Sequence, residues 1–360
     1  MGGAVEKVWF ALGKELARRG HDVVHVSRHC KGLPREEVIE GVRHIRVRGF
    51  DAPASLALLK GLDLIYSLRV LRVLPKADIL ITNTFWLPML VRSNRFGNLY
   101  VHVARYPKGQ MRFYGHAARL QTISRPIRDA IVREVPQWAD KVHYIPLPLP
   151  DGVLANAGQA PAREKHLLYV GRVHPEKGIA LLIDAVALIT AEQIQGWKLV
   201  VVGPAELRYG GGGDEYLAEL KHRAEKISDR IVWVGSVFDN GQLDEYYRRA
   251  SLFVYPSLAE KGETFGLAPL EAMAQGCPAL VSNLECFREF IDEDVTGFVF
   301  DHRSPVPAQT LATKLQELIQ DGERLAETGI EAHRKAQEFS LERIGAAYLD
   351  DFQSIMKGST

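Results

Sequence analysis

Hydrophobic positions in the first half of the chain predict one helix followed by alternating strands and helices. The helix is predicted from apolar residues at helical spacing, namely Val5, Val8, Trp9, Leu12 and Leu16. Gly20 follows them as a glycine at the C′ position of a helix would. Short apolar runs predict buried strands at 21–27, 44–50, 77–83, 98–103, 119–124 and 141–150. The polar, proline-containing stretch 151–165 is typical of a linker.

The second half of the chain restarts this pattern. Strands are predicted at 166–172, 197–203, 230–236, 251–257 and 277–283, with helix-compatible stretches between them. Strands that alternate with helices form parallel sheets covered on both faces. The expected fold class is therefore α/β, with two doubly wound, Rossmann-like domains at 1–150 and 165–340. We expect their sheets to face each other across a cleft, with ligands beyond the carboxyl ends of the strands.

Composition supports two domains in a reducing compartment. A chain of 360 residues exceeds what one hydrophobic core usually serves. We find no long apolar run and no signal peptide, so a cytoplasmic location is expected. The three cysteines, Cys30, Cys277 and Cys286, have neither metal-site spacing nor a disulfide framework.

The net charge of +1 conceals an uneven distribution. Residues 1–150 carry 24 Lys and Arg against 12 Asp and Glu, and the remainder carries 21 against 32. A basic half favours an anionic partner such as a membrane surface, a nucleic acid or a phosphorylated ligand. The alternative is a dipolar protein whose halves attract each other, and the charges alone leave both open.

Two carboxylates, Glu263 and Glu271, stand eight residues apart in the stretch EKGETFGLAPLEAMAQGCPAL, residues 260–280. The acid pair of a retaining glycosidase needs carboxyl groups about 5–5.5 Å apart. Eight residues of continuous helix span roughly 12 Å, so the spacing does not favour a hydrolytic pair. Two carboxylates that accept hydrogen bonds from hydroxyl groups, one on a sugar and one on a ribose, fit better.

A helix is expected to begin inside this stretch, with Pro269 as its first residue and Ala268 as a poor cap. Its first N–H groups would then be free to bind an anion, and Gly266 would allow close approach of the backbone. Glu271 would be the third helical residue, a position that the helix dipole alone also favours.

The segment VGRVHPEKG, residues 170–178, supplies cations beside a strand end. Arg172 leaves the predicted strand and Lys177 precedes the glycine that leads into an apolar helix. A guanidinium fork and a point charge together suit a diphosphate. One Arg and one Lys near a strand end are also common surface residues, so the assignment depends on the neighbouring motifs.

These motifs together resemble a known family. VGRVHPEKG, VVVGP, VWVGSV, FVYPS and ETFGLAPLEAMAQGCPALVS occur in this order within 165–300 and closely resemble retaining GT-B glycosyltransferases of family 4, with their E-x7-E motif. The first half matches more loosely, through GGAVEKVWFALGKELARRGHDVVHVS, YVHVARYPKGQ and TISRPIRDAIVRE. AAYLDDFQSIM, residues 346–356, looks like the C-terminal helix of the family, so a helix at about 341–357 is expected to pack on the first domain.

The resemblance implies a retaining hexosyltransferase that uses a nucleoside diphosphate sugar. The favoured donor is a UDP-sugar such as UDP-glucose, and the acceptor is a glycan or lipid-linked glycan in polysaccharide or glycoconjugate biosynthesis. Residues 1–150 would bind the acceptor and 165–340 the donor. The resemblance implies no cofactor and no metal, because protein cations and helix N–H groups would stabilise the leaving diphosphate.

The resemblance also implies roles for individual residues. Arg172 and Lys177 would hold the diphosphate and Glu271 the ribose hydroxyls. Glu263 would hold the donor sugar, and His102, after a first-domain strand, would face that sugar. The implied catalytic residues are thus Arg172, Lys177, Glu263 and His102. The implied donor-binding residues include the backbone around the donor sugar, the segment that faces the base and the glycine loop. They are Glu271, Phe265, Gly266, Leu267, Ser236, Val237 and Gly3.

The chain departs from the family at its start. MGGAVE corresponds to the glycine loop that normally follows a first hydrophobic strand, so we expect either a late start or a first-domain sheet with a gap. The D-x-D string at Asp292–Asp294 is not interpreted as a metal site, because IDEDVTG is typical of a solvated turn.

Other functions remain open at the sequence level. A GT-B sugar-nucleotide epimerase would convert the donor without an acceptor, and a non-catalytic nucleotide-sugar-binding protein would bind the donor without turnover. We find no nucleic-acid-binding motif. The segment LIYSLRVLRVLPK, residues 64–76, mixes apolar residues with Arg69, Arg72 and Lys76. It suggests contact with anionic lipid at the inner face of a membrane, or else an ordinary helix packed on the sheet.

Overall fold

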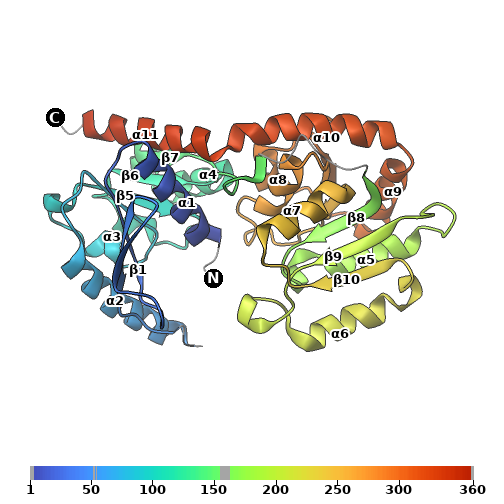
Figure 1. Ribbon diagram of the computed structural model, residues 1–360, viewed down its shortest axis with the longest axis horizontal. Coiled ribbons are helices and arrows are strands. Elements are labelled where there is room, and N and C mark those ends of the chain that lie inside the picture. The colour runs from blue at the N-terminus through green and yellow to red at the C-terminus, as the bar shows by residue number, and fades with distance from the viewer. Residues whose placement is uncertain (1–3, 52, 54, 155–162, 358–360) are drawn as a thin grey trace. The chain divides into compact units, whose positions relative to one another are not determined.

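The computed structural model describes residues 4–51, 53, 55–154 and 163–357 (Figure 1). The chain forms two compact α/β units. Unit 1 comprises Met1–Pro150 and Leu341–Thr360, and unit 2 comprises Asp151–Ser340. Among the described residues, no helix is both long and apolar enough to cross a membrane.

Unit 2 contains one parallel sheet with the strand order β10-β9-β8-β11-β12-β13. The strands are β8 (Glu164–Val170), β9 (Lys198–Val202), β10 (Ile231–Gly235), β11 (Ala250–Tyr255), β12 (Ala279–Ser282) and β13 (Phe298–Phe300). The central strands are continuous runs of buried apolar residues, as is typical of a parallel sheet covered on both faces. The strands predicted from the apolar runs of the second half are confirmed.

Helices cover both faces of this sheet, as Figure 1 shows for α5–α8. The helices of unit 2 are α5 (Ile179–Leu188), α6 (Gly213–Arg223), α7 (Asn240–Arg249), α8 (Leu267–Ala274), α9 (Pro307–Ile319) and α10 (Gly322–Ala336). Helix α5 packs against α6 and α9, and α8 packs against α7 and α10. Along the chain, β8, β9 and β10 are added side by side toward one edge of the sheet. The chain then returns to β11, which pairs with the other side of β8. The strand order therefore reverses between β8 and β11, which is the topological switch point of the sheet.

Unit 1 contains two sheets rather than one. The first has the order β1-β3-β2 and the second has four parallel strands in the order β4-β5-β6-β7. The strands are β1 (Val23–Arg28), β2 (Glu36–Ile39), β3 (Val42–Val47), β4 (Ile79–Thr82), β5 (Asn98–Val103), β6 (Arg119–Thr122) and β7 (Val142–Tyr144). No described strand joins β1 to β4.

One helix packs against both sheets of unit 1. Val26 on β1 and Leu80 on β4 contact the same hydrophobic cluster, to which α2 contributes Val70 and its C-cap residue Leu74. The helices of unit 1 are α1 (Ala4–Arg18), α2 (Leu56–Val73), α3 (Leu87–Leu90), α4 (Arg125–Glu134) and α11 (Leu341–Lys357). The two sheets are thus held by shared packing on α2 instead of by a strand between them.

Two strands were missed from the sequence because they are short. Strand β2 runs antiparallel to β3 through a turn at Glu40 and Gly41, whose φ angles are 47° and 82°. Two consecutive positive φ angles are typical of a type I′ hairpin, for which glycine at the second position is a sequence signal. Strand β13 has three residues, too few to show a period. Gly20 does end α1, with a φ of 90° and an N–H that donates to Ala17 O.

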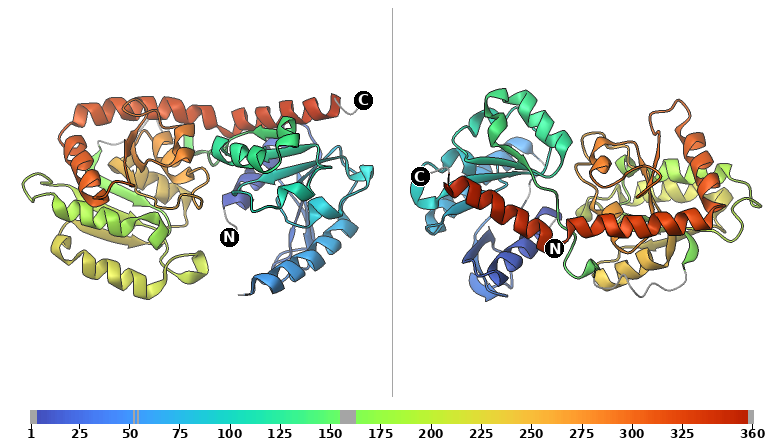
Figure 2. Two further views of the ribbon diagram at one scale, coloured as in Figure 1. Left: turned by 180° about the vertical axis from the view of Figure 1, so that it is seen from behind. Right: turned by 90° about the horizontal axis from the view of Figure 1, so that it is seen from above.

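Helix α11 packs on α1 and is fixed to the second sheet of unit 1 by a buried carboxylate, Asp351 (Figures 1 and 2). Arg119 donates to Asp351 at 2.7 and 3.1 Å, and the Tyr100 hydroxyl donates at 2.9 Å. His143 Nδ1 lies 3.0 Å from Asp351 Oδ1. Burial alone would raise the pKa of Asp351, but the hydrogen bonds from His143 and Tyr100 and the Arg119 charge together lower it. One carboxylate therefore joins α11 to strands β5, β6 and β7.

We expect Asp351→Asn to lower the free energy of unfolding by about 3 kcal/mol, because it leaves the buried Arg119 guanidinium without its counter-charge. The matched control is Asp350→Asn, since Asp350 is the exposed neighbouring residue on the same helix. It should change stability by less than about 0.5 kcal/mol. Urea denaturation followed by circular dichroism measures both variants. Equal effects of the two substitutions would contradict the assigned role of Asp351.

Candidate functional site

The candidate site lies at the carboxyl ends of β8 and β11, the two neighbouring strands at the switch point of unit 2. Arg172 and Lys177 follow β8. Glu263 and α8 follow β11. Two loops distant in sequence therefore meet at one edge of the sheet, because their strands pair side by side.

Lys177 and Glu263 form a buried ion pair at this edge. The Lys177 ammonium donates to Glu263 Oε2 at 2.7 Å, and both residues are buried. The Ser257 hydroxyl donates to the same oxygen at 3.3 Å, and the ammonium lies 5.5 Å from the centre of the Tyr255 ring. Because an ammonium has three donors, the pair with Glu263 leaves donors for a ligand.

Tyrosine rings form the apolar floor beneath this pair. Tyr169 and Tyr255 stack with ring centres 5.9 Å apart, and both are buried. Burial raises the pKa of both tyrosines well above its ordinary value, and the Glu263 carboxylate raises it further. Both rings therefore stay neutral.

Gly178 brings the two loops into backbone contact. It has a φ of 72° and precedes the first residue of α5. A Cβ atom there would lie 1.9 Å from the carbonyl oxygen of Pro256, in the loop after β11. Any side chain would therefore push the loops apart and separate Lys177 from Glu263.

Helix α8 begins two residues earlier than the sequence suggested. Its first residue is Leu267 and its N-cap is Gly266, so Pro269 is the third helical residue and Glu271 the fifth. The interpretation with Pro269 first and Ala268 as the cap was wrong, because Gly266 adopts a φ of 90° that makes the turn into the helix. A Cβ atom at Gly266 would lie 2.5 Å from the Phe287 ring.

The N-terminus of α8 has no side-chain cap. Its N-cap residue, Gly266, has no side chain and so makes no cap hydrogen bond. The N–H groups of Leu267 and Ala268 belong to the first helical turn, which has no intrahelical acceptor. Pro269 has no N–H to satisfy. The end of the helix thus keeps the capacity to bind an anion that the sequence predicted.

Arg172 lies at the same strand end but is exposed. Its guanidinium donates to Glu176 Oε1 at 2.9 Å and to the Gly210 carbonyl at 2.8 Å. The side chains of Arg172 and Glu176 are 43% and 36% exposed. An ion pair of this kind contributes little stability, so an incoming anion can replace the carboxylate at small cost.

Glu271 lies on α8 and is fixed by a neighbouring helix. The Tyr247 hydroxyl, from α7, donates to Glu271 Oε2 at 3.1 Å. Tyr247 is fully buried, and burial together with the Glu271 charge raises its pKa well above the ordinary value. The hydroxyl therefore remains a donor and orients the half-buried carboxylate.

The other predicted donor-binding residues are spread over the same sheet. Phe265 is buried and Leu267 begins α8. Ser236 and Val237 follow β10, two strands away from β8, and Ser236 donates to Glu206 Oε2 at 3.3 Å. Two strand spacings are about 10 Å, so these residues lie on the sheet edge beyond the Lys177 loop. Gly3 lies outside the described residues.

His102 belongs to unit 1, where it is the second-last residue of β5 and lies within the strand instead of after it. It is buried. Its Nδ1 lies 2.5 Å from Gln121 Oε1, and the two residues face each other in the β5–β6 register. Gln121 Nε2 donates to the carbonyls of Thr122 and Ile145, so Oε1 must accept from His102 Nδ1–H. His102 Nε2 is buried and has no partner among the described residues. This nitrogen therefore carries an unused lone pair.

The D-x-D string is exposed, as the sequence indicated. Asp294 has a φ of 62° in the turn before β13 and pairs with Arg324 at 2.7 Å and with Lys314 at 3.6 Å. Among the described residues, no group of three His, Cys, Asp or Glu side chains could hold a metal ion. The Asp294 carboxylate is thus occupied by protein cations.

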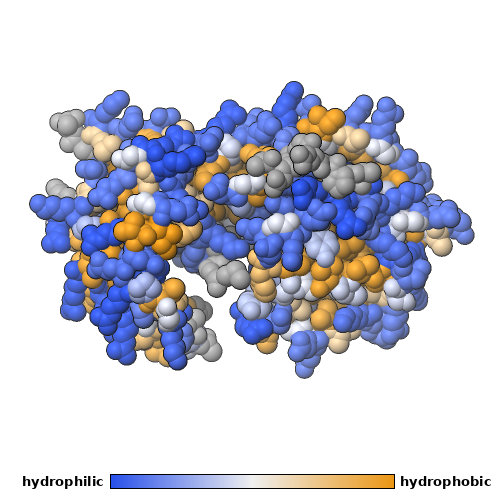
Figure 3. All heavy atoms as spheres, viewed as in Figure 1, coloured by the Kyte–Doolittle hydropathy of each residue, from blue (hydrophilic) through white to orange (hydrophobic). Residues whose placement is uncertain are grey.

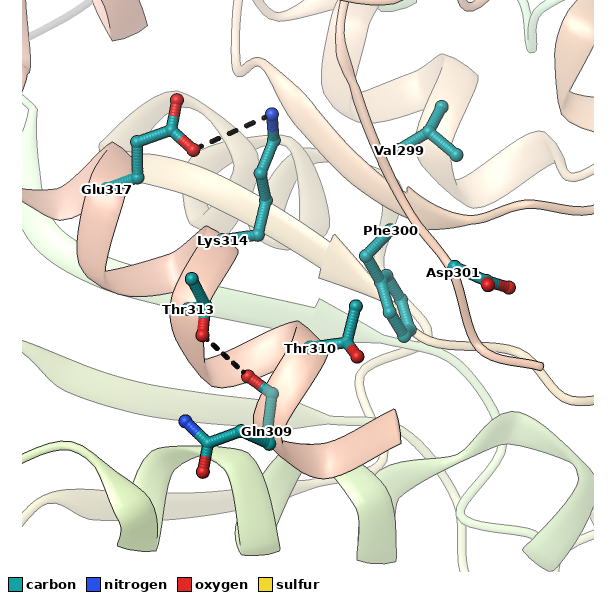
Figure 4. Close-up of a pocket in the computed structure, with 8 residues that line it drawn as sticks. All are labelled: Val299, Phe300, Asp301, Gln309, Thr310, Thr313, Lys314 and Glu317. Carbon is teal, nitrogen blue, oxygen red and sulfur yellow. Dashed lines mark hydrogen bonds and ion pairs between the residues drawn. The ribbon is translucent and has the colours of Figure 1, made fainter. Parts of the chain in front are cut away.

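A surface pocket of about 400 Å³ lies elsewhere in unit 2, between β13 and α9 (Figure 4). It is lined by Val299, Phe300, Asp301, Gln309, Thr310, Thr313, Lys314 and Glu317. Lys314 pairs with Glu317 at 3.8 Å, and Thr313 donates to the Gln309 carbonyl at 2.9 Å. Its charged side chains Lys314 and Glu317 are paired with each other, and none of the candidate site residues lines it.

Several residues of the site were missed from the sequence. They are Glu176, Tyr247, Tyr255 and Ser257 in unit 2 and Gln121 in unit 1. Gln121 had a signal, because it is a polar residue inside the buried strand RLQTIS. The others have common surface or core residue types, and only the meeting of distant loops reveals their contacts.

Comparisons with protein families match almost the whole chain. The family described as "Glycosyl transferases group 1" matches residues 154–335, and "Glycosyl transferase 4-like domain" matches residues 3–148. The lipopolysaccharide core biosynthesis mannosyltransferase LpsB of Rhizobium meliloti (strain 1021) is 29% identical over 193 residues. That match covers 52% of this chain and 51% of LpsB, so the chain spans about half the length of this relative.

Solved structures share the fold at low sequence identity. Sucrose-phosphate synthase from Thermosynechococcus elongatus has a TM-score of 0.80 and 21% identity, over 99% of this chain and 94% of that structure. Anabaena Alr3699/HepE in complex with UDP and glucose has a TM-score of 0.72 and 17% identity, over 98% and 96%. The chain belongs to the glycosyl transferases group 1 family and has the α/β fold of the GT-B glycosyltransferases.

Proposed function

We propose that the protein is a retaining glycosyltransferase that transfers a hexose from a UDP-sugar to a glycan or lipid-linked acceptor, without a metal ion. The relative LpsB is by its name a mannosyltransferase of lipopolysaccharide core biosynthesis, which supports an acceptor of the glycoconjugate class. We assign the reaction to the cytoplasm, since the three cysteines are unpaired, as is typical of a reducing compartment.

The observation that carries this proposal is the meeting of Lys177, Glu263 and the uncapped end of α8 at the switch point of unit 2. A nucleoside diphosphate sugar needs cations for its diphosphate and hydroxyl-binding carboxylates for its sugars. At this edge, Lys177 and Glu263 hold each other in a buried ion pair, and the buried Tyr247 holds the Glu271 carboxylate. Arg172 adds a second cation whose exposed pair with Glu176 opens at small cost.

The chemistry follows from these groups. The bond between the anomeric carbon and the diphosphate oxygen breaks, and its electron pair leaves with the diphosphate. The acceptor oxygen bonds to the anomeric carbon on the same face, and its proton passes to the departing phosphate oxygen. Lys177, Arg172 and the N–H groups of α8 stabilise the charge that develops on the diphosphate. Prepositioned donors in this role take the place of a metal ion.

UDP is the favoured nucleotide because Anabaena Alr3699/HepE, which shares the fold, was solved with UDP and glucose. Within unit 2, Ser236 and Val237 lie about 10 Å from the Lys177 loop, a spacing that suits a base at one end of a diphosphate. We assign Glu271 to the ribose, because Tyr247 directs its carboxylate from the neighbouring helix.

The proposed activity is tested by incubating the chain with UDP-sugars, with and without a glycan acceptor library. Transfer that requires acceptor, retains the anomeric configuration and continues in EDTA supports the proposal. Conversion of the donor without acceptor would instead identify an epimerase. Tight donor binding with no turnover under any acceptor would identify a nucleotide-sugar-binding protein.

We expect the double variant Lys177→Met/Glu263→Gln to bind UDP about 10- to 100-fold more weakly, because it removes a charged hydrogen bond to the diphosphate. Changing both residues avoids leaving one buried charge unpaired. The matched control is Lys261→Met, an exposed lysine in the same loop, which should leave the affinity unchanged. Calorimetric titration measures each Kd. A double variant with the affinity of the wild type would refute the diphosphate assignment.

The ribose assignment predicts a loss of hydroxyl discrimination in Glu271→Ala. The wild type should bind UDP about tenfold more tightly than 2′-deoxy-UDP, since a hydrogen bond to a carboxylate contributes about 1.5 kcal/mol or more. In Glu271→Ala the two ligands should bind equally. Glu293→Ala, which removes an exposed carboxylate, should keep the ratio. Persistence of the ratio in Glu271→Ala would assign the ribose to another residue.

His102 is expected to be a neutral hydrogen-bond acceptor for a sugar hydroxyl. Burial lowers its pKa to about 4, and its unpartnered Nε2 can accept but not donate. Nitrogen NMR should show a protonated Nδ1 and an unprotonated Nε2 that do not titrate between about pH 5.5 and 8. The unfolded state binds this proton near pH 6.5, so stability should fall by about 3 kcal/mol as the pH decreases from 6.5 to 4.

Gln121→Leu provides the test of this tautomer. It removes the acceptor for Nδ1–H, so the two nitrogen signals should become averaged between tautomers. Ser67→Ala, a change of another buried polar residue in unit 1, should leave the signals of His102 unchanged. Titration of wild-type His102 near pH 6.5 would show that the ring is solvated and would remove its proposed role.

A further inference from the structure

The loop between β11 and α8, which carries Glu263, is tied to other loops of unit 2 through a second carboxylate, Glu260. Arg303 Nε and Nη2 donate to the two Glu260 oxygens at 2.8 and 2.7 Å. The Arg303 guanidinium, more than the hydrogen bond from His302, lowers the pKa of Glu260, so this carboxylate is ionised at neutral pH. His302 Nε2 lies 3.0 Å from Glu260 Oε1 and must donate, because an ionised carboxylate only accepts. We call Glu260, His302 and Arg303 the Glu260 cluster.

The Glu260 cluster joins the ends of three neighbouring strands. Glu260 follows β11, whereas His302 and Arg303 follow β13. Arg303 Nη1 also donates at 2.8 Å to the carbonyl of Asn283, the residue after β12. Strands β11, β12 and β13 pair in this order, so the cluster spans their carboxyl ends. His302 is buried, and it therefore anchors the cluster in the body of unit 2.

A tight turn connects the cluster to Glu263. The N–H groups of Gly262 and Glu263 both donate to the Ala259 carbonyl, at 3.1 and 2.9 Å. On the other side of the turn, Leu258 N–H donates to the Glu176 carbonyl at 2.8 Å. The turn is thus held by the loop after β8 on one side and by the Glu260 cluster on the other. Loss of the cluster would leave Glu263 on a turn with one of these two anchors.

An ion pair on this surface does not by itself indicate a role. Hydrophilic residues cover much of the face of unit 2 that Figure 3 shows. Exposed ion pairs contribute little unless their geometry is ideal or several charges form a network. The Glu260 cluster meets both conditions, because its guanidinium pair is bidentate and a buried histidine adds a third donor.

We propose that Glu260 and Arg303 are positioning residues, which hold Glu263 in place for a hydroxyl of the donor sugar. They act through the turn and need not touch the donor. A displacement of about 1 Å in a binding group can cost roughly 100-fold in rate, so even a small shift of the turn matters. The inference deepens the proposed function and rests on it, because it takes Glu263 as a carboxylate that binds the sugar.

The kinetic test compares Glu260→Gln, Arg303→Leu and their double variant with the wild type. Each should lower kcat/KM about tenfold for the UDP-sugar with which the wild type is most active. The Kd of UDP, measured by calorimetry, should stay within about twofold, since Lys177 and Arg172 lie outside the turn. The double variant should be no slower than the single ones, because all three remove the same interaction.

Amide hydrogen exchange tests the turn itself in the absence of any ligand. The Gly262 and Glu263 amides should exchange about tenfold faster in Glu260→Gln and in Arg303→Leu, because the turn opens locally at a lower free energy once one anchor is lost. Circular dichroism melting verifies that each variant is folded.

The matched control is Asp184→Asn. Arg223 on α6 donates to the two oxygens of Asp184 on α5 at 2.6 and 3.0 Å, which gives another bidentate pair on the surface of unit 2. The side chains of Arg223 and Asp184 are 42% and 36% exposed, against 46% and 51% for Arg303 and Glu260. The control should leave both the exchange and kcat/KM unchanged.

The outcomes separate this role from the proposed function. A wild type that neither binds UDP nor transfers a sugar would overturn the proposed function and the positioning role with it. In an active wild type, unchanged kcat/KM in the cluster variants would overturn the positioning role alone. Unchanged amide exchange, a tenfold loss of UDP affinity, or an equal loss of kcat/KM in the control would also overturn it.

Discussion

The buried ion pair between Lys177 and Glu263 is the interaction on which the rest of the candidate site depends. Two charges removed from water are stable only when their geometry is good and their remaining polar atoms are satisfied. The strand order provides the good geometry, because β8 and β11 are neighbours. The Ser257 hydroxyl satisfies part of the remaining hydrogen-bonding capacity, because it donates to the Glu263 carboxylate. Gly178 completes the arrangement, since any side chain there would collide with the loop after β11.

In the proposed function, the fixed cation at the end of β8 can receive the diphosphate because the backbone beside it has the same polarity. Gly266 turns the chain into α8 without a capping side chain, so the end of the helix presents N–H groups and a partial positive charge. Arg172 differs from Lys177, because its partner Glu176 is exposed and an anion can replace it at small cost. The site therefore combines rigid positive groups with one that can be recruited by the ligand, and rigid groups need no reorganisation as charge develops.

The sequence predicted the strands well where apolar runs were long. It could not show the first residue of α8, because a glycine that caps a helix with positive φ leaves no mark that distinguishes it from a loop glycine. Nor could it pair His102 with Gln121. That contact depends on the register between β5 and β6, which is set by the packing of the whole sheet and not by either strand. Local patterns predict elements, whereas contacts between elements follow from topology.

The uneven charge of the chain is not explained by the proposed donor site. The cations assigned to the diphosphate, Arg172 and Lys177, both lie in the half with more acidic than basic residues. The excess of basic residues in 1–150 therefore has no part in holding the donor through these two side chains. Several of those residues gather around α2, next to aliphatic side chains that packing does not bury. The charge asymmetry is therefore a property of the first half of the chain and does not arise from the cations of the proposed donor site.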